Sequence, residues 1–181
     1  MTVIAAIFSQ SCIALASDSF ITETNPNGGH TIIESQQSKI VPIPQLRAAA
    51  SYWGLARYGT WSTFDWLISR TIKIKSGISL EAFAHNLKDD LKNEFLRLRI
   101  PNQQSGIGIH ITGYEQVNGY WIPELFLIST FRGTDYSNIG ELEVSRHTVW
   151  TIFKESVSPS DYGKQEFRMQ VHERLQEGSL L

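Results

Sequence analysis

The chain has 181 residues, of which 41% are apolar and 19% are charged, as expected of a soluble globular protein with one domain. Its formal net charge of -2 excludes the strongly basic balance of proteins that bind nucleic acids or anionic membranes. The single cysteine excludes an intramolecular disulfide, and no stretch reaches the roughly 20 apolar residues of a membrane span. The apolar N-terminus lacks the basic start of a secretion signal. We therefore expect one cytoplasmic domain over residues 1–181, without a nucleic-acid or membrane partner.

The first part of the chain predicts short strands joined by tight turns. Residues 2–8 and 12–16 are almost continuously apolar, which is typical of buried strands, and the polar residues between them can turn the chain into a hairpin. The Asn-Pro-Asn-Gly-Gly segment at 25–29 is a strong turn signal. The further strands expected here are residues 20–22, 31–33, 39–43 and 46–52.

The rest of the chain predicts two helices, a second hairpin, one more strand and a terminal helix. Ser79 is a good N-cap, because apolar residues recur at helical spacing directly after it. Asn118 and Gly119 form the strongest short hairpin signal in the chain. Segregated strands and helices favour the α+β class. The expected helices are 60–74, 79–98 and 162–176, and the expected strands are 106–114, 120–131 and 142–153.

Thr2 directly follows the initiator Met1, and an N-terminal threonine can act as nucleophile and base at once. Its hydroxyl attacks while its own α-amino group, with an unperturbed pKa of about 7.7–8, accepts the proton. A nearby lysine would lower the pKa of this amine through like-charge repulsion, and a carboxylate would hold the lysine in place. Asp18 ends the first predicted hairpin close to Thr2, and Lys39 opens a later strand. These residues could therefore form such a site once Met1 is removed.

The sequence resembles the proteasome β-subunit family, including the proteasome-like peptidases of bacteria. The resemblance rests on the spacing from Thr2 to Asp18, on the small-residue strand that leads to Gly54, and on other short segments in the first third of the chain. It implies the N-terminal nucleophile hydrolase fold, a four-layer αββα sandwich with two antiparallel sheets. It also implies a threonine peptidase or amidohydrolase that forms an acyl-enzyme ester, which water then cleaves. The segments that carry the resemblance are residues 2–5, 14–19 with Thr22, 38–40 and 50–56.

The resemblance implies a catalytic role for three residues. Thr2 would be the nucleophile and base, Asp18 the orienting carboxylate, and Lys39 the charge that tunes the amine. The substrate would be a peptide or a small amide, and neither a cofactor nor a metal is expected. Related subunits work in rings, so a homo-oligomer is expected, whereas the ring size and any ATPase partner cannot be read from the sequence.

The resemblance also implies three residues on the substrate side of the site. Ile21 would point into the pocket for the residue before the scissile bond. Thr22 would lie on the strand that pairs with an extended substrate. A backbone N–H near Gly54 would donate to the oxyanion.

The chain departs from the family pattern at several places. The segment from Asp18 to Lys39 is longer than the usual family spacing, although the turn at 25–29 could absorb the extra residues. Trp53 stands where the family has a glycine, and it could alter the oxyanion hole or fill the pocket. The C-terminal half carries less helix than the family's, which fits a reduced or truncated domain. The loop after the second hairpin lacks the Gly-Ser-Gly pattern, so the candidates for the supporting serine and second aspartate are Ser129, Asp135 and Ser137.

The same residues permit a structural interpretation. Asp18 is also a reasonable turn residue after a strand, and Lys39 is a reasonable strand-edge lysine. The competing hypothesis is therefore a catalytically silent member of the same fold that acts as a structural or binding subunit. A third hypothesis keeps the N-terminal chemistry and applies it to a small amide. A free amine on Thr2 beside Lys39 separates the enzyme from the silent subunit.

Overall fold

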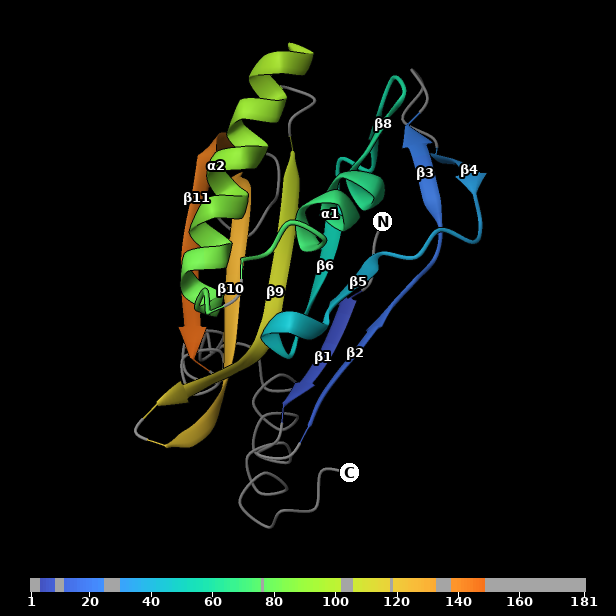
Figure 1. Cartoon of the computed structure of the whole chain (residues 1–181). Helices are drawn as coiled ribbons and strands as arrows, with labels where there is room; N and C mark the ends of the chain where they lie inside the picture. Colours follow the sequence, from blue (N-terminus) through green and yellow to red (C-terminus); the bar gives the residue numbers. More distant parts are fainter. Residues whose placement is uncertain are drawn as a thin grey trace, which may run out of the picture.

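The computed structural model describes residues 4–8, 12–24, 30–75, 77–101, 106–117, 119–132 and 138–148. Thr2, Asp135, Ser137 and the helix expected over 162–176 lie outside these residues. The elements, shown in Figure 1, are in chain order β1 (Ile4–Phe8), β2 (Ile13–Ser17), β3 (Ile21–Thr24), β4 (His30–Glu34), β5 (Ile40–Ile43), a 3-10 turn (Pro44–Leu46), β6 (Ala48–Gly54), β7 (Arg57–Tyr58), β8 (Trp61–Ser62), α1 (Thr63–Thr71), α2 (Leu80–Leu98), β9 (Ile107–Val117), β10 (Tyr120–Arg132) and β11 (Asn138–Thr148).

A five-stranded antiparallel sheet forms the centre of the described fold, in the strand order β11-β10-β9-β6-β5. Val117 of β9 pairs with Tyr120 of β10, which confirms the hairpin predicted around Asn118 and Gly119. Gly119 has a φ of 85°, a backbone conformation that glycine adopts without strain. The predicted first hairpin is also confirmed, since β1 and β2 pair with each other in a separate two-stranded sheet.

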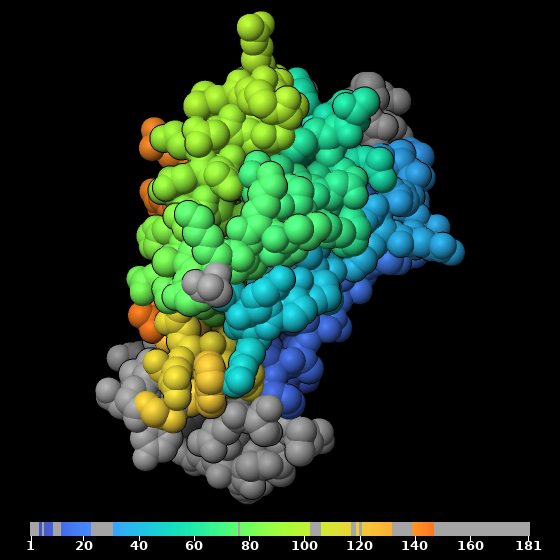
Figure 2. Space-filling view, viewed as in Figure 1, coloured from blue at the N-terminus to red at the C-terminus, as the bar shows by residue number. Residues whose placement is uncertain are grey.

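Both helices pack on one face of the central sheet. α1 contacts β5, and α2 contacts β9, β10 and β11 (Figure 1). Ile107, Ile109 and Ile111 alternate along β9 and are fully buried against the helices, where they join Leu87 and Leu91 of α2 in the core. Figure 2 shows this face of the molecule largely covered by the side chains of the two helices. The core on this face holds in place the strands β5 and β6, which carry the site residues.

The two helices begin at serine caps. The Oγ of Ser79 accepts a hydrogen bond from the N–H of Ala82 at 3.1 Å, which confirms the predicted N-cap of α2. The prediction that the first helix begins at residue 60 is wrong. Residues 61–62 pair with residues 57–58 as a short hairpin that turns at Gly59, so α1 begins only at Thr63.

Two strand boundaries also differ from the prediction. The strand expected over 46–52 begins at Ala48, because Pro44–Leu46 form a 3-10 turn that ends at Arg47 with a φ of 49°. β11 begins at Asn138, ahead of the expected start at Leu142. The antiparallel sheets and the two helices of the described residues agree in general terms with the predicted α+β class. No helix in the described part of the chain is long and apolar enough to cross a membrane.

Candidate active site

Asp18 and Lys39 form a close ion pair in the structure. The Nζ of Lys39 donates a hydrogen bond to Oδ2 of Asp18 at 2.9 Å. Lys39 is only 2% exposed, whereas the side chain of Asp18 is 19% exposed. A buried ammonium group is costly unless a carboxylate compensates its charge, and Asp18 supplies such a carboxylate. The structure therefore brings Asp18 and Lys39 into direct contact, as the sequence predicted.

The ends of β2 and β5 bring this pair together. Asp18 directly follows β2, and Lys39 directly precedes β5. The chain between them leaves and returns as the β3–β4 hairpin. The base of that hairpin is closed by a backbone hydrogen bond from Gln37 N to Ser19 O at 3.2 Å and by one from Ser19 Oγ to Ser35 O at 2.9 Å. The hairpin thus takes up the longer spacing between Asp18 and Lys39 without separating their side chains.

Thr2 itself lies outside the described residues, but the strand that follows it is described. Ile4, the first residue of β1, pairs with Ser17, which directly precedes Asp18. The beginning of β1 and the ion pair are therefore at the same end of the first hairpin.

A small cavity of about 40 Å³ lies beside Lys39. All three residues predicted for the substrate side, Ile21, Thr22 and Gly54, line this cavity together with Lys39. The structure thus places one predicted catalytic residue and the three predicted substrate-binding residues around a common space. Trp53, which the sequence suggested could fill the pocket, lines the cavity too, and three further lining residues were not assigned from the sequence: Phe20, Tyr52 and Ala56.

Tyr52 holds the two backbone carbonyls that flank the α-carbon of Lys39. Its N–H donates to the carbonyl of Lys39 at 3.2 Å, and its hydroxyl donates to the carbonyl of Ser38 at 3.3 Å. Tyr52 is fully buried, and this burial, with a smaller effect from Glu34, raises the pKa of its phenol to about 12. The phenol therefore stays protonated near neutral pH and remains a hydrogen-bond donor.

Trp53 packs on the face of β6 opposite to Tyr52, because neighbouring strand residues point to opposite faces of a sheet. Its ring packs against His110 of β9 in a tilted arrangement, with ring centroids 4.5 Å apart and an interplanar angle of 42°. The indole lies directly over Gly108, where an added Cβ would be 2.0 Å from the ring. The glycine on β9 therefore makes room for the tryptophan on β6, and Trp53 contributes a wall of the cavity.

Gly54 needs to be glycine for two reasons. Its φ is 81°, and an added Cβ would lie 2.3 Å from the carbonyl oxygen of Gly106. The N–H of the next residue, Leu55, already donates to the same carbonyl at 2.8 Å. Of these two amides, the N–H of Gly54 is therefore the better candidate for an oxyanion donor.

The structure does not bring Ser129 to this cavity. Ser129 lies on β10 opposite Gly108, and its Oγ accepts a hydrogen bond from the N–H of Phe131 at 2.9 Å. Ser129 could support the site only through intervening residues. Asp135 and Ser137 lie outside the described residues.

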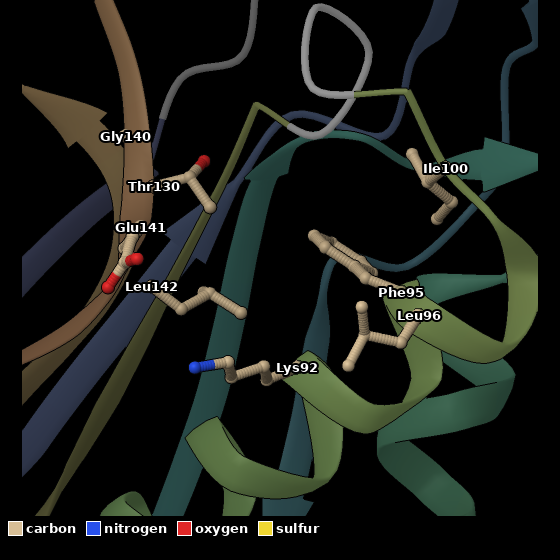
Figure 3. Close-up of a pocket in the computed structure, with 8 residues that line it drawn as sticks. All are labelled: Lys92, Phe95, Leu96, Ile100, Thr130, Gly140, Glu141 and Leu142. Atoms are coloured by element: carbon tan, nitrogen blue, oxygen red, sulfur yellow. The ribbon is translucent and has the colours of Figure 1, made fainter.

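A second, larger cavity of about 160 Å³ lies between the C-terminal half of α2 and the strands β10 and β11 (Figure 3). Its lining mixes apolar side chains, with Phe95, Leu96 and Ile100 on one side and Leu142 on the other, with the polar side chains of Lys92, Thr130 and Glu141. The hydroxyl of Thr130 is engaged with the backbone of Ile107, so it is not a free nucleophile. The cavity beside Lys39 is the better candidate for chemistry.

The described ranges hold no cluster of three or more His, Cys, Asp or Glu side chains that could bind a metal ion. Comparison with models of protein families finds no match, and comparison with curated proteins finds none either.

Proposed function

We propose that this protein is an N-terminal threonine hydrolase that cleaves peptide or other amide bonds through an acyl-enzyme. The observation that carries the proposal is the buried ion pair of Lys39 and Asp18, which lies at the beginning of β1 and beside a cavity lined by Ile21, Thr22 and Gly54. A buried lysine at this position stabilises the core little, because its burial requires a compensating charge. Its positive charge would, however, lower the pKa of a neighbouring amine that must act as a base.

Ile4 pairs with Ser17, which directly precedes Asp18. Two residues of extended chain span at most about 7 Å, and we propose that Thr2 lies within this distance on the side of the ion pair. We propose that removal of Met1 leaves the α-amine of Thr2 beside the Nζ of Lys39. The positive charge of Lys39 then lowers the pKa of this amine, so that more of it is neutral and able to accept a proton.

The proposed reaction proceeds in two halves. The Thr2 hydroxyl attacks the substrate carbonyl while its proton passes to the α-amine, and the N–H of Gly54 stabilises the oxyanion that forms. The C–N bond then breaks, the leaving amine takes the proton, and an ester remains on Thr2. A water molecule, deprotonated by the same α-amine, attacks that ester and restores the threonine hydroxyl.

We further propose the four-layer αββα sandwich for the complete chain. The central sheet with both helices on one face would supply two layers, and the separate β1–β2 hairpin would belong to the second sheet. Self-association into a ring and a cytoplasmic location remain parts of this proposal.

A catalytically silent subunit of the same fold is the second candidate. Trp53 favours it, because this large side chain lines the cavity at a position where the resembled family has a glycine. Packing of its ring over Gly108 and against His110 counts against the idea that the indole fills the cavity.

Hydrolysis of a fluorogenic peptide panel by matched variants tests the proposed function. Thr2→Ala keeps the amine and loses the hydroxyl, so kcat/KM should fall at least about a thousandfold, while Thr2→Ser should retain activity. Lys39→Met should lose about tenfold, because the α-amine of Thr2 then has its unperturbed pKa and is mostly protonated at neutral pH. Thr60→Ala, at an exposed turn threonine, is the control and should match the parent.

Melting temperatures of all four variants show whether the fold persists. If Thr2→Ala cleaves as fast as the parent, the nucleophile lies elsewhere. If the parent with a free Thr2 amine cleaves nothing, even as an assembled oligomer, the silent subunit replaces the enzyme.

A further inference from the structure

The larger cavity, between α2 and the strands β10 and β11, lies where the pairing of these two strands is interrupted. The register shifts between Ser129 and Phe131 of β10, so that Thr130 alone stands against residues 140–142 of β11. This irregularity is a β-bulge, a feature that breaks the ladder and bends the strand locally. Thr130 and all three residues of the bulge line the cavity. The cavity is therefore an open cleft between the bulged edge strand and the helix that packs across it (Figure 3).

The cleft has an apolar wall. Phe95 and Leu96 lie in the last turn of α2, and Ile100 follows its C-cap. Leu142 faces them from β11 (Figure 3). Leu96 is 69% exposed, and it adjoins the other apolar side chains of the cleft. An apolar group that entered the cleft would remove this surface from water, which is favourable.

The cleft also carries one cation and one anion, on different elements. Lys92 extends from α2 toward β11, and Glu141 belongs to β11 (Figure 3). Within the described part of the chain Lys92 forms no ion pair, whereas Lys88, one helical turn earlier, pairs with Asp89 at 2.8 Å. The ammonium group of Lys92 can therefore bind a carboxylate of a ligand. The two oxygens of Glu141 can accept a hydrogen bond from an ammonium group in addition to the contact that Glu141 already makes.

These two charges distinguish between classes of ligand. A simple carboxylate that reached Lys92 would also approach the negative charge of Glu141, and a simple amine would approach the positive charge of Lys92. A molecule that carries both charges and one apolar group complements the whole lining. Free amino acids with an apolar side chain have this combination.

We propose that this cleft binds a free amino acid with an apolar side chain, such as leucine. Lys92 holds its carboxylate, Glu141 holds its ammonium group, and the side chain packs against the apolar wall. The cleft shares no lining residue with the cavity beside Lys39. The inference stands without the proposed function, because binding at this site needs neither Thr2 nor hydrolysis.

NMR titration of the ¹⁵N-labelled full chain with L-leucine tests the proposed site. Saturable shifts should appear at the amides of residues 92–100 and 140–142. Three analogues each lack one group: 4-methylpentanoate lacks the ammonium group, 3-methylbutylamine lacks the carboxylate, and glycine lacks the apolar side chain. Each should bind at least about fivefold more weakly than leucine, the value of one partly exposed ion pair or of a small apolar contact.

Two variants with surface substitutions remove the charges one at a time. Lys92→Met and Glu141→Gln should each weaken leucine binding about fivefold. Lys88→Met and Glu143→Gln are the matched controls, since they change the same residue types on the same two elements outside the cleft, and they should bind leucine as the parent does. The amide spectrum of each variant shows directly whether its fold persists.

The possible outcomes separate the ligand from the site. If 4-methylpentanoate binds as tightly as leucine, or if Glu141→Gln leaves leucine binding unchanged, the cleft takes an apolar carboxylate and the proposed ligand is wrong. Unchanged binding in Lys92→Met, or shifts confined to the residues around Lys39, overturns the proposed site. Absence of a saturable shift up to about 10 mM leucine overturns the inference as a whole. None of these results bears on the proposed hydrolase, which the Thr2 variants test.

Discussion

Gly54 and Gly59 show how differently two glycines with positive φ constrain the chain. Both have left-handed backbones, with φ of 81° and 59°. A Cβ at Gly59 would meet nothing within 4 Å, whereas a Cβ at Gly54 would lie 2.3 Å from the carbonyl oxygen of Gly106. Gly54 therefore carries both a conformational and a steric requirement, and it sits in the wall of the candidate site.

We expect Gly54→Ala to lower the free energy of unfolding by about 3 kcal/mol or more, because backbone strain and a clash with main-chain atoms add together. Gly59→Ala is the matched control and should cost only about 1–2 kcal/mol, the penalty of the left-handed conformation alone. Urea denaturation of both variants checks this difference. Equal losses would mean that the close approach of Gly54 to Gly106 contributes nothing.

The raised pKa of the Tyr52 phenol predicts that the protein loses stability in alkali. Burial raises the pKa of its phenol from 10.0 in the reference state to about 12. The unfolded phenol loses its proton first as the pH rises, so the contribution of Tyr52 is complete below about pH 10 and is lost as the pH approaches about 12. The loss should be at most about 2–3 kcal/mol.

Urea denaturation between these pH values, compared with Tyr52→Phe, measures this contribution. The parent should lose more stability than Tyr52→Phe over the window, and Tyr58→Phe should behave as the parent because it retains Tyr52. Parallel curves for the parent and Tyr52→Phe would show that the phenol is not held in its neutral form by the fold.

At the scale of elements, the pairing of β6 with β9 decides how Trp53 is accommodated. Trp53 pairs with Gly108, and its ring occupies the space that a side chain at 108 would need. This register also places His110 next to the indole, where the two rings pack in a tilted arrangement. A bulky residue near the candidate site is thus tolerated because a glycine lies opposite to it on the neighbouring strand.

Gly108→Ala should displace the indole and cost about 1–3 kcal/mol, as overpacking of a filled site does. The double variant Trp53→Leu with Gly108→Ala should recover stability relative to the sum of the single changes, because the two substitutions share one contact. Tryptophan fluorescence and urea denaturation of the three variants check this coupling. Additive losses would show that Trp53 and Gly108 do not compete for space.

Local sequence patterns were sufficient to predict the position of part of the site. Asp18 and Lys39 are close because each adjoins the end of a strand and because the chain between them forms a hairpin, which the turn residues at 25–29 indicate. Ile21 and Thr22 follow on the first strand of that hairpin. These contacts depend on hairpins, whose geometry is encoded over short distances.

Other features depend on residues far apart in the chain, and the sequence pattern could not show them. The space for Trp53 comes from Gly108, and the two hydrogen bonds of Tyr52 depend on the register of β5 against β6. The late start of α1 reflects the β7–β8 hairpin, which competes with the helix for Trp61 and Ser62. Apolar spacing alone predicted a helix over residues that pair as strands.

At the scale of the whole molecule, the central sheet and its helices support the candidate site from one side. The helices bury one face of the sheet, and this fixes β5 and β6. Lys39 stands directly before β5, while Tyr52, Trp53 and Gly54 lie at the end of β6. The β1–β2 hairpin brings Asp18 to the same place. A site assembled from three separate parts of the chain should therefore depend on the complete fold.

The central claim is that Thr2 becomes the nucleophile once Met1 is removed. Its most direct test is intact-mass spectrometry of the natively produced protein, before and after incubation with a peptide that acylates amino-terminal threonines. We expect a mass that lacks Met1, and after incubation one added acyl group that maps to Thr2 and is absent from Thr2→Ala. Full retention of Met1, or an acyl group that persists in Thr2→Ala, would contradict the account.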